Sequence, residues 1–92
     1  MTDHLAEFVY ALSGRDKGKC FVVLSQKDNY LYLCDGKRRK AQKPKCKKIK
    51  HVRLTGDYDE NLRKILADVG RLTNKEVRFA LKAYRASNPD CL

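Results

Sequence analysis

Three stretches in the first half of the chain combine β-branched and aromatic residues at a density typical of strands. They are FVYAL (8–12), KCFVVL (19–24) and NYLYLC (29–34). The segments SGRDKG, SQKD and DG that follow them are rich in residues that form turns. Asp35-Gly36 is a strong tight-turn dipeptide, because glycine accepts a positive φ. The pattern therefore predicts three consecutive strands, the last of which ends at a turn.

The segment after this turn is less regular. Pro44 lacks a backbone donor and favours an extended conformation at Lys43, so KAQKPK (40–45) is predicted to be an irregular or edge segment. KIKHVRL (48–54) regains apolar character, but its spacing breaks strict alternation, which indicates a bulge or a short turn. We therefore expect a loop that is held between strands.

After Gly56 the apolar residues change to a helical period. They fall at i, i+3, i+4 and i+7, at Leu62, Ile65, Leu66 and Val69. Asp57 or Asp59 is the expected N-cap, and Gly70 is the expected stop. The pattern predicts one amphipathic helix.

The segment TNKEVRFALKAYRA (73–86) predicts a second helix. Thr73 and Glu76 have the spacing of a capping box, and Pro89 follows the end of the segment. The apolar positions are Val77, Ala80, Leu81 and Tyr84. Such stripes usually face their own protein, so we expect the helices to pack on the sheet or on each other, with a second docking surface as the alternative.

Strands followed by helices predict the α+β class. The 92 residues suit a single domain, 1–92, with one folding unit. Apolar residues at 42% and charged residues at 35% fit a globular protein with a polar surface. No apolar run approaches the length of a membrane span, and the N-terminus has no signal-peptide pattern, so we expect a cytoplasmic protein.

The charge is concentrated in one segment. Ten Lys or Arg residues and no acid lie between Lys37 and Arg53, and the eleven other cations are balanced by eleven acids. The whole net charge of +10 therefore resides in seventeen residues. Such clustering indicates an anionic partner, because a solvated surface gains nothing from self-repulsion within one segment. A solvated loop is the alternative.

The four cysteines do not suggest a metal site. Cys20, Cys34, Cys46 and Cys91 contain no closely spaced pair, so we expect no metal, no cofactor and four reduced, unpaired thiols. His51 has no nucleophile motif beside it, and no glycine-rich nucleotide loop occurs. The sequence therefore predicts a protein without catalytic residues.

Two segments of the chain resemble a known motif. SGRDKGKCFVVL followed by NYLYLCDGKRRKAQKPKCKKIKHVRL resembles the KOW motif as it occurs in small bacterial RNA-binding proteins related to archaeal and eukaryotic large-subunit ribosomal proteins. The resemblance covers 6–54, and LTNKEVRFALKAYR is similar to the helical end of that bacterial group. It implies a small, strongly bent SH3-like β-barrel at 6–54, followed by a helical hairpin at 57–86.

The resemblance also implies RNA as the partner, namely ribosomal RNA or the ribosome itself. We expect the protein to be cytoplasmic, ribosome-associated and a monomer when free. Gly14 opens the first loop and Gly18 follows it, and both are expected to be structural, like the turn residues Asp35 and Gly36. KOW domains commonly touch RNA through the first loop. The expected RNA-binding residues are Arg15, Lys17, Lys37, Arg38, Arg39, Lys40, Lys43, Lys45, Lys47, Lys48, Lys50 and Arg53.

Arginines and aromatic residues have distinct expected roles at such a site. Arg38 and Arg39 suit fork-like phosphate contacts, whereas lysines act as mobile point charges. Most aromatic residues lie in strand segments where burial is usual, and Tyr30, which borders a turn, is the best candidate for base stacking. Recognition of RNA shape and backbone is the general expectation.

Two other classes of function stay open. KOW domains also serve as protein-docking modules in transcription and translation factors. In this alternative, the barrel and the last helix bind a polymerase or a ribosomal protein. Adhesion to an anionic membrane is disfavoured, because the basic segment has almost no large apolar residue to insert apart from Ile49.

Overall fold

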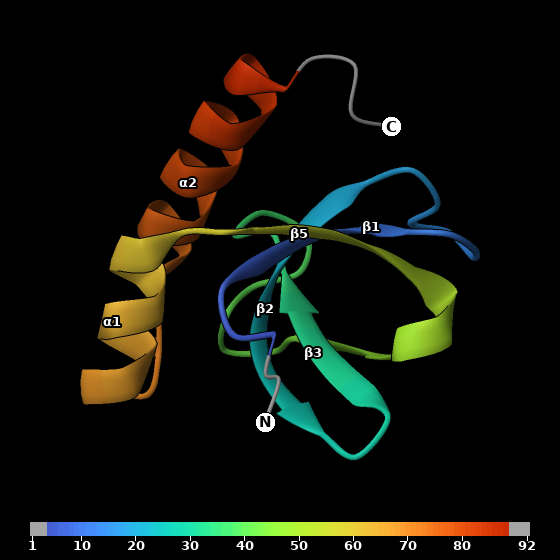
Figure 1. The fold of residues 1–92 in the computed structure, drawn as a ribbon, viewed down its shortest axis with the longest axis horizontal. Coiled ribbons are helices and arrows are strands. Elements are labelled where there is room, and N and C mark those ends of the chain that lie inside the picture. The colour runs from blue at the N-terminus through green and yellow to red at the C-terminus, as the bar shows by residue number, and fades with distance from the viewer. Residues whose placement is uncertain (1–3, 89–92) are drawn as a thin grey trace.

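The computed structural model describes residues 4–88 and consists of a five-stranded antiparallel sheet and two helices (Figure 1). The strands are β1 (Glu7–Ala11), β2 (Cys20–Lys27), β3 (Tyr30–Cys34), β4 (Lys45–Lys48) and β5 (Val52–Tyr58). A 3-10 turn, η1 (Ile49–His51), joins the last two strands. The helices are α1 (Glu60–Asp68) and α2 (Asn74–Ser87). The predicted α+β class is confirmed.

The sheet has the strand order β4-β3-β2-β1-β5 and is open, with β4 and β5 at its edges. β4 begins directly after Pro44, as the edge placement expected for this segment requires. The β1–β5 pairing shifts register between Glu7 and Val9, and the β2–β3 pairing shifts between Val23 and Ser25. Such irregularities increase the local twist, and the sheet is strongly curved (Figure 1).

Each face of the sheet carries its own apolar cluster, because side chains alternate along a strand. On one face, Val9 of β1 packs with residues of β2, β3 and β5 that include Phe21 and Leu31. On the other face, Phe8 and Tyr10 pack with side chains of both helices. Every residue of β1 is consequently buried.

The two helices cover one face of the sheet, and the chain reverses between them (Figure 1). The buried helical residues are Leu62, Leu66, Val77, Ala80, Leu81 and Tyr84. Tyr84 stacks on Phe8 with ring centroids 4.1 Å apart, and its hydroxyl donates to Asp57 Oδ2 at 3.0 Å. The expectation that both apolar stripes face the protein core is therefore confirmed, with one exception.

The exception is Val69, which is 64% exposed. α1 ends at Asp68, and the chain leaves the helix through Val69 and through Gly70 at a φ of +83°. The prediction that Val69 belongs to the buried stripe is wrong, because the helix stops one residue before it.

The predicted helix caps are present. The Asp59 carboxylate accepts from Leu62 N at 3.0 Å, so Asp59 and not Asp57 caps α1. Thr73 and Glu76 form a reciprocal capping box at the start of α2. Pro89, the expected stop after α2, lies outside the described residues.

Candidate nucleic-acid interface

The basic loop, residues 35–44 between β3 and β4, begins with a turn that Asp35 organises. Asp35 Oδ1 accepts from the backbone N–H groups of Lys37 and Arg39 at 2.8 and 2.9 Å. The carbonyl of Arg39 accepts in turn from the backbone amides of Asp35 and Gly36. These bonds occupy the only carboxylate within the loop and fix the path of its backbone.

α2 holds the same loop through three further hydrogen bonds. Arg78 Nη1 donates to Gly36 O at 2.7 Å, and Ala41 N donates to Asn74 Oδ1 at 2.7 Å. Asn74 Nδ2 also donates to Gln42 Oε1 at 2.9 Å. Gly36 lies so close to α2 that a Cβ there would be 2.5 Å from Asn74 O. The helix therefore sets the position of the basic loop.

The first loop, residues 12–19 between β1 and β2, is joined to the basic loop by an ion pair. Arg39 Nη2 donates to Asp16 Oδ2 at 2.8 Å, and the Asp16 side chain is 8% exposed. Burial opposes ionisation of Asp16, but the hydrogen bond and charge of Arg39 outweigh it, helped by Lys19 and Lys45, so the pKa of Asp16 lies below its usual value. Arg39 thus holds two loops together.

A lysine ties β4 to the first loop in a similar way. Lys47 Nζ donates to Ser13 O at 2.7 Å and lies 3.5 Å from where a Cβ of Gly14 would be. Gly14 and Gly18, at the two ends of this loop's turn, have φ values of +79° and +84°. Both adopt the left-handed region that favours glycine.

Arg53 is a third predicted RNA-binding residue that makes an internal contact. Its guanidinium carbon lies 4.8 Å from the centroid of the Tyr10 ring, in a cation–π arrangement, and its side chain is partly buried. The structure therefore uses Arg39, Lys47 and Arg53 to hold the sheet and loops together. The other predicted cations are exposed, apart from Lys45, which is half-buried.

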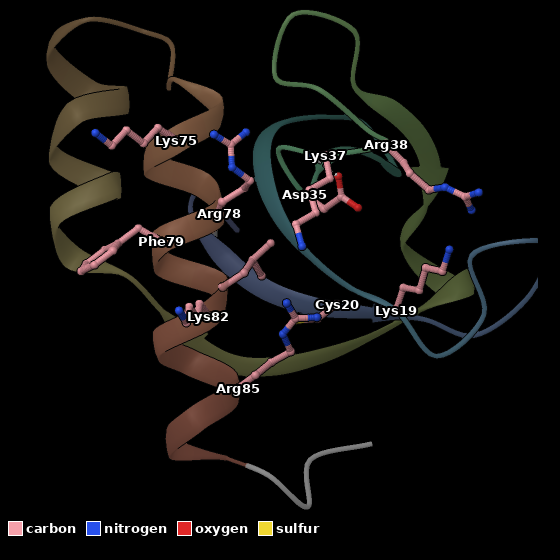
Figure 2. A pocket seen from close by; sticks show the side chains of 11 residues that line it. Lys19, Cys20, Asp35, Lys37, Arg38, Lys75, Arg78, Phe79, Lys82 and Arg85 are labelled. Atoms are coloured by element: carbon pink, nitrogen blue, oxygen red, sulfur yellow. Dashed lines mark hydrogen bonds between the residues drawn. The ribbon is translucent and has the colours of Figure 1, made fainter.

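The largest concentration of charge lies in a groove between α2 and the sheet, which we name the α2 groove (Figure 2). The groove has a volume of about 600 Å³. Seven cationic residues line it, namely Lys19, Lys37, Arg38, Lys75, Arg78, Lys82 and Arg85. The single acid that lines it is Asp35, whose carboxylate is occupied by loop amides. The residues that line the groove thus give it a positive electrostatic potential.

Four of these cations come from α2 and were not among the residues predicted from the sequence. They stand at i, i+3, i+7 and i+10, which is the spacing of one helix face: Lys75, Arg78, Lys82 and Arg85. The apolar stripe of the same helix lies beside this row of cations, and Leu81 of the stripe also lines the groove. Figure 2 shows Arg78 and Arg85 on the side of α2 toward the sheet, whereas Phe79 points away from it.

A second hollow, of about 680 Å³, lies along the basic loop itself. It is lined by Arg38, Arg39, Lys40, Lys43, Pro44, Lys45 and Cys46. Arg38 lines both this hollow and the α2 groove, so the two surfaces are continuous. We refer to them together as the basic track.

The remaining predicted residues lie outside these two cavities. Lys48 and Lys50 line a small pocket beside Tyr30 at the far end of β4. Arg15 and Lys17 are exposed on the first loop and line none of these cavities. The structure therefore brings the basic loop and α2 together with Lys19 of the first loop, and it leaves Arg15 and Lys17 outside both cavities.

Three of the four cysteines lie in the part of the chain that the structure describes. Cys20 and Cys34 are buried, and Cys46 is exposed. Burial, with the charge of Asp35, raises the pKa of the Cys34 thiol to about 12, so this cysteine stays protonated. Cys91 lies outside the described residues.

Comparisons with known proteins add no further evidence on the site. No family model matches the chain, and no curated protein is similar to it. Across residues 4–88, neither helix has the length and apolar character that a membrane crossing requires. The function is therefore argued from the geometry of the basic track.

Proposed function

We propose that this protein is a non-enzymatic RNA-binding protein that holds the phosphate backbone of RNA in the α2 groove and along the basic loop. The observation that carries the proposal is the composition of the groove: seven cations and one acid whose carboxylate already accepts backbone hydrogen bonds. A polyanion releases counterions when it enters such a groove, which favours binding without sequence recognition.

The resemblance to KOW proteins favours RNA over other polyanions. Three features of the fold support the likeness to a KOW domain: β1 pairs with both β2 and β5, a 3-10 turn precedes β5, and Gly18 precedes β2. We propose that the curved sheet is an SH3-like KOW domain and that α1 and α2 form its helical extension. The extension then has a functional role, because α2 supplies half of the groove.

The cations of the track divide into contacting and positioning residues. Arg38 and Arg85 are exposed and offer planar forks that match phosphate oxygens, while the lysines add mobile charges. Arg39 and Lys47 act on RNA through the loops that they hold in place. We therefore assign the phosphate contacts to Lys37, Arg38, Lys40, Lys43, Lys82 and Arg85.

The proposed partner is ribosomal RNA or another structured RNA, bound by a monomer in the cytoplasm in association with the ribosome. The test is sedimentation of the tagged protein from cell lysate through sucrose gradients at low and high salt, with sequencing of the bound RNA. Co-migration with a ribosomal particle that is lost at high salt supports the proposal, because phosphate contacts weaken with salt.

Charge reversal separates the basic track from other surfaces in the same experiment. Arg38→Glu combined with Arg85→Glu should release the protein from the particle, because both residues are exposed and line the α2 groove. Lys64→Glu, on the exposed side of α1, is the matched control and should leave sedimentation unchanged. Migration only as free protein, with no enriched RNA, contradicts the ribosomal assignment.

A second candidate function, docking to a protein of the transcription or translation machinery, is favoured by one observation. Phe79 and Val69 are 76% and 64% exposed, and Phe79 lies among the residues that line the α2 groove. Exposed large apolar side chains often mark protein contacts. If docking dominates, Phe79→Ser should abolish co-migration with the particle, and the Arg38→Glu, Arg85→Glu variant should retain it.

A further inference from the structure

A small pocket lies at the end of the sheet where β3 begins and β4 ends. It has a volume of about 490 Å³ and is lined by Asn29, Tyr30, Lys48, Ile49 and Lys50. These residues combine one aromatic ring, one apolar side chain, one amide and two cations. The proposed phosphate contacts of the basic track do not include this pocket, and its composition differs from that of the α2 groove.

The aromatic ring of the pocket is accessible, unlike most rings of the sheet. Tyr30 is 40% exposed, whereas Phe8, Tyr10 and Phe21 are buried. Lys48 Nζ lies 5.8 Å from the Tyr30 ring centroid, within cation–π range. The sheet also holds the backbone at Tyr30, since Tyr30 is paired with Lys48 across β3 and β4, and Ile49 N donates to Asn29 O at 2.8 Å. Tyr30 is therefore an exposed π-surface on a fixed backbone, with positive charge beside it.

The pocket lies on the continuation of the basic track. β4 is an edge strand in which Cys46, paired with Tyr32, lines the basic-loop hollow and Lys48, paired with Tyr30, lines the pocket. Two residues of a β-strand span roughly 7 Å. Stacked nucleotides advance about 3.4 Å each along one nucleic-acid strand, so two nucleotides cover the same distance. A backbone bound in the hollow can thus reach the pocket within a few nucleotides.

We propose that the Tyr30 pocket binds one unpaired nucleobase of the RNA, stacked on the Tyr30 ring, with Lys48 and Lys50 at the flanking phosphates. The inference rests on the proposed RNA-binding function and adds a class of ligand to it: a single-stranded segment next to the structured RNA. Grooves that combine cations with accessible aromatic rings hold single strands in this way, because every base has a π-face. A base paired inside a duplex cannot reach the ring.

The test is the affinity of the full chain for a fluorescein-labelled eight-nucleotide uridine RNA, measured by fluorescence anisotropy at low salt. Tyr30→Leu should weaken binding about 5- to 150-fold, which corresponds to the loss of one stacked base. Tyr30→Phe should retain most of the affinity, because the ring remains. The slope of log K against log salt should stay unchanged in both variants, since neither removes a charge.

The matched control is Tyr58→Leu. Tyr58 is 45% exposed and has Arg63 over its ring at 4.0 Å, so it resembles Tyr30 in exposure and charge but lies at the other edge of the sheet, on β5. Its replacement should leave RNA affinity unchanged. Circular dichroism melting of every variant verifies that the chain is folded.

Two results overturn the inference, and they are distinguishable. If the wild-type chain binds RNA and Tyr30→Leu binds it equally well, the base-stacking site is refuted and the basic track alone accounts for binding. If the wild-type chain binds neither the uridine RNA nor a hairpin RNA at low salt, the proposed function fails together with the inference. A loss of affinity in Tyr30→Leu and not in Tyr58→Leu supports the inference.

Discussion

At the scale of single residues, Gly36 is the point of closest approach between the basic loop and α2. It has a φ of +78°, and a Cβ would be 2.5 Å from Asn74 O and 2.8 Å from Arg78 Cγ. Backbone atoms of a capped helix cannot move aside at low cost. The residue therefore combines a conformational requirement with a steric one.

Gly36→Ala should lower the free energy of unfolding by about 2–4 kcal/mol, the sum of strain at positive φ and overpacking against α2. Gly18→Ala is the matched control, because Gly18 has a similar φ of +84° but a Cβ added there would meet no atom within 4 Å. This variant should therefore lose only about 1–2 kcal/mol, which is the backbone strain at positive φ. Urea denaturation followed by circular dichroism measures both. Equal losses would contradict the close approach of loop and helix.

The ion pair of Asp16 and Arg39 predicts a pH-dependent contribution to stability. Because the folded pKa of Asp16 is lowered, its carboxylate stabilises the fold above the unfolded pKa of about 3.9, and this contribution is lost as pH falls through the folded pKa. Asp16→Asn should cost about 1–3 kcal/mol at pH 7 and progressively less below pH 4. Urea unfolding at pH 7, 5 and 3 measures the difference, and a cost independent of pH would contradict the account.

The Asp16–Arg39 pair also shows which residue-level features the sequence could not reveal. The basic segment predicted Arg39 as an RNA contact because it stands among cations, but its acidic partner lies 23 residues earlier. Only the pairing of β1, β2 and β3 brings the two loops together. Local features such as the Thr73–Glu76 capping box, by contrast, depend on residues three positions apart and follow directly from the sequence.

At the scale of elements, α2 has two roles: its apolar stripe packs on the sheet, and the cations beside that stripe line the α2 groove. The double variant Lys82→Gln, Arg85→Gln should bind RNA more weakly than wild type. The slope of log K against log salt should become shallower by about 1.4–1.8, because each lost phosphate contact accounts for about 0.7–0.9. Both residues are exposed, so stability should change by less than about 0.5 kcal/mol each. Fluorescence anisotropy across a salt series measures the slope.

The control for α2 is Lys64→Gln, which removes one exposed cation from α1, outside the groove. It should leave the slope unchanged. If Lys64→Gln reduces affinity as much as the α2 variant, binding follows total charge and not the groove.

The element scale is also where the sequence predicted most of the fold. Strand positions, the edge character of the segment after Pro44 and both helices follow from apolar period, turn residues and caps. Val69 was assigned to the buried stripe because its spacing fits the helix, but the glycine after it ends the helical path. The row of cations on α2 was not predicted, although its spacing is visible in the sequence. The eleven cations outside the basic segment equal the acids in number, but they are not distributed evenly with them along the chain.

At the scale of the whole molecule, the proposed RNA-binding surface is one that neither half of the chain forms alone. The loops of the sheet supply Lys19, Lys37 and Arg38, and α2 supplies the other four cations from a later part of the chain. A molecule of 31 × 31 × 26 Å thus concentrates its charge in one continuous track. Its affinity for RNA should depend on salt much more steeply than that of a protein with a single charged loop contact.

The most direct test of this central claim is the salt dependence of RNA binding by the purified chain, measured by anisotropy with a labelled hairpin that carries a single-stranded extension. If about five phosphates are contacted, the slope of log K against log salt should lie between about −3 and −5. The Arg38→Glu, Arg85→Glu variant should bind weakly and with a shallower slope. A wild-type slope near zero, or equal binding by wild type and variant, would contradict the proposal that the basic track holds RNA.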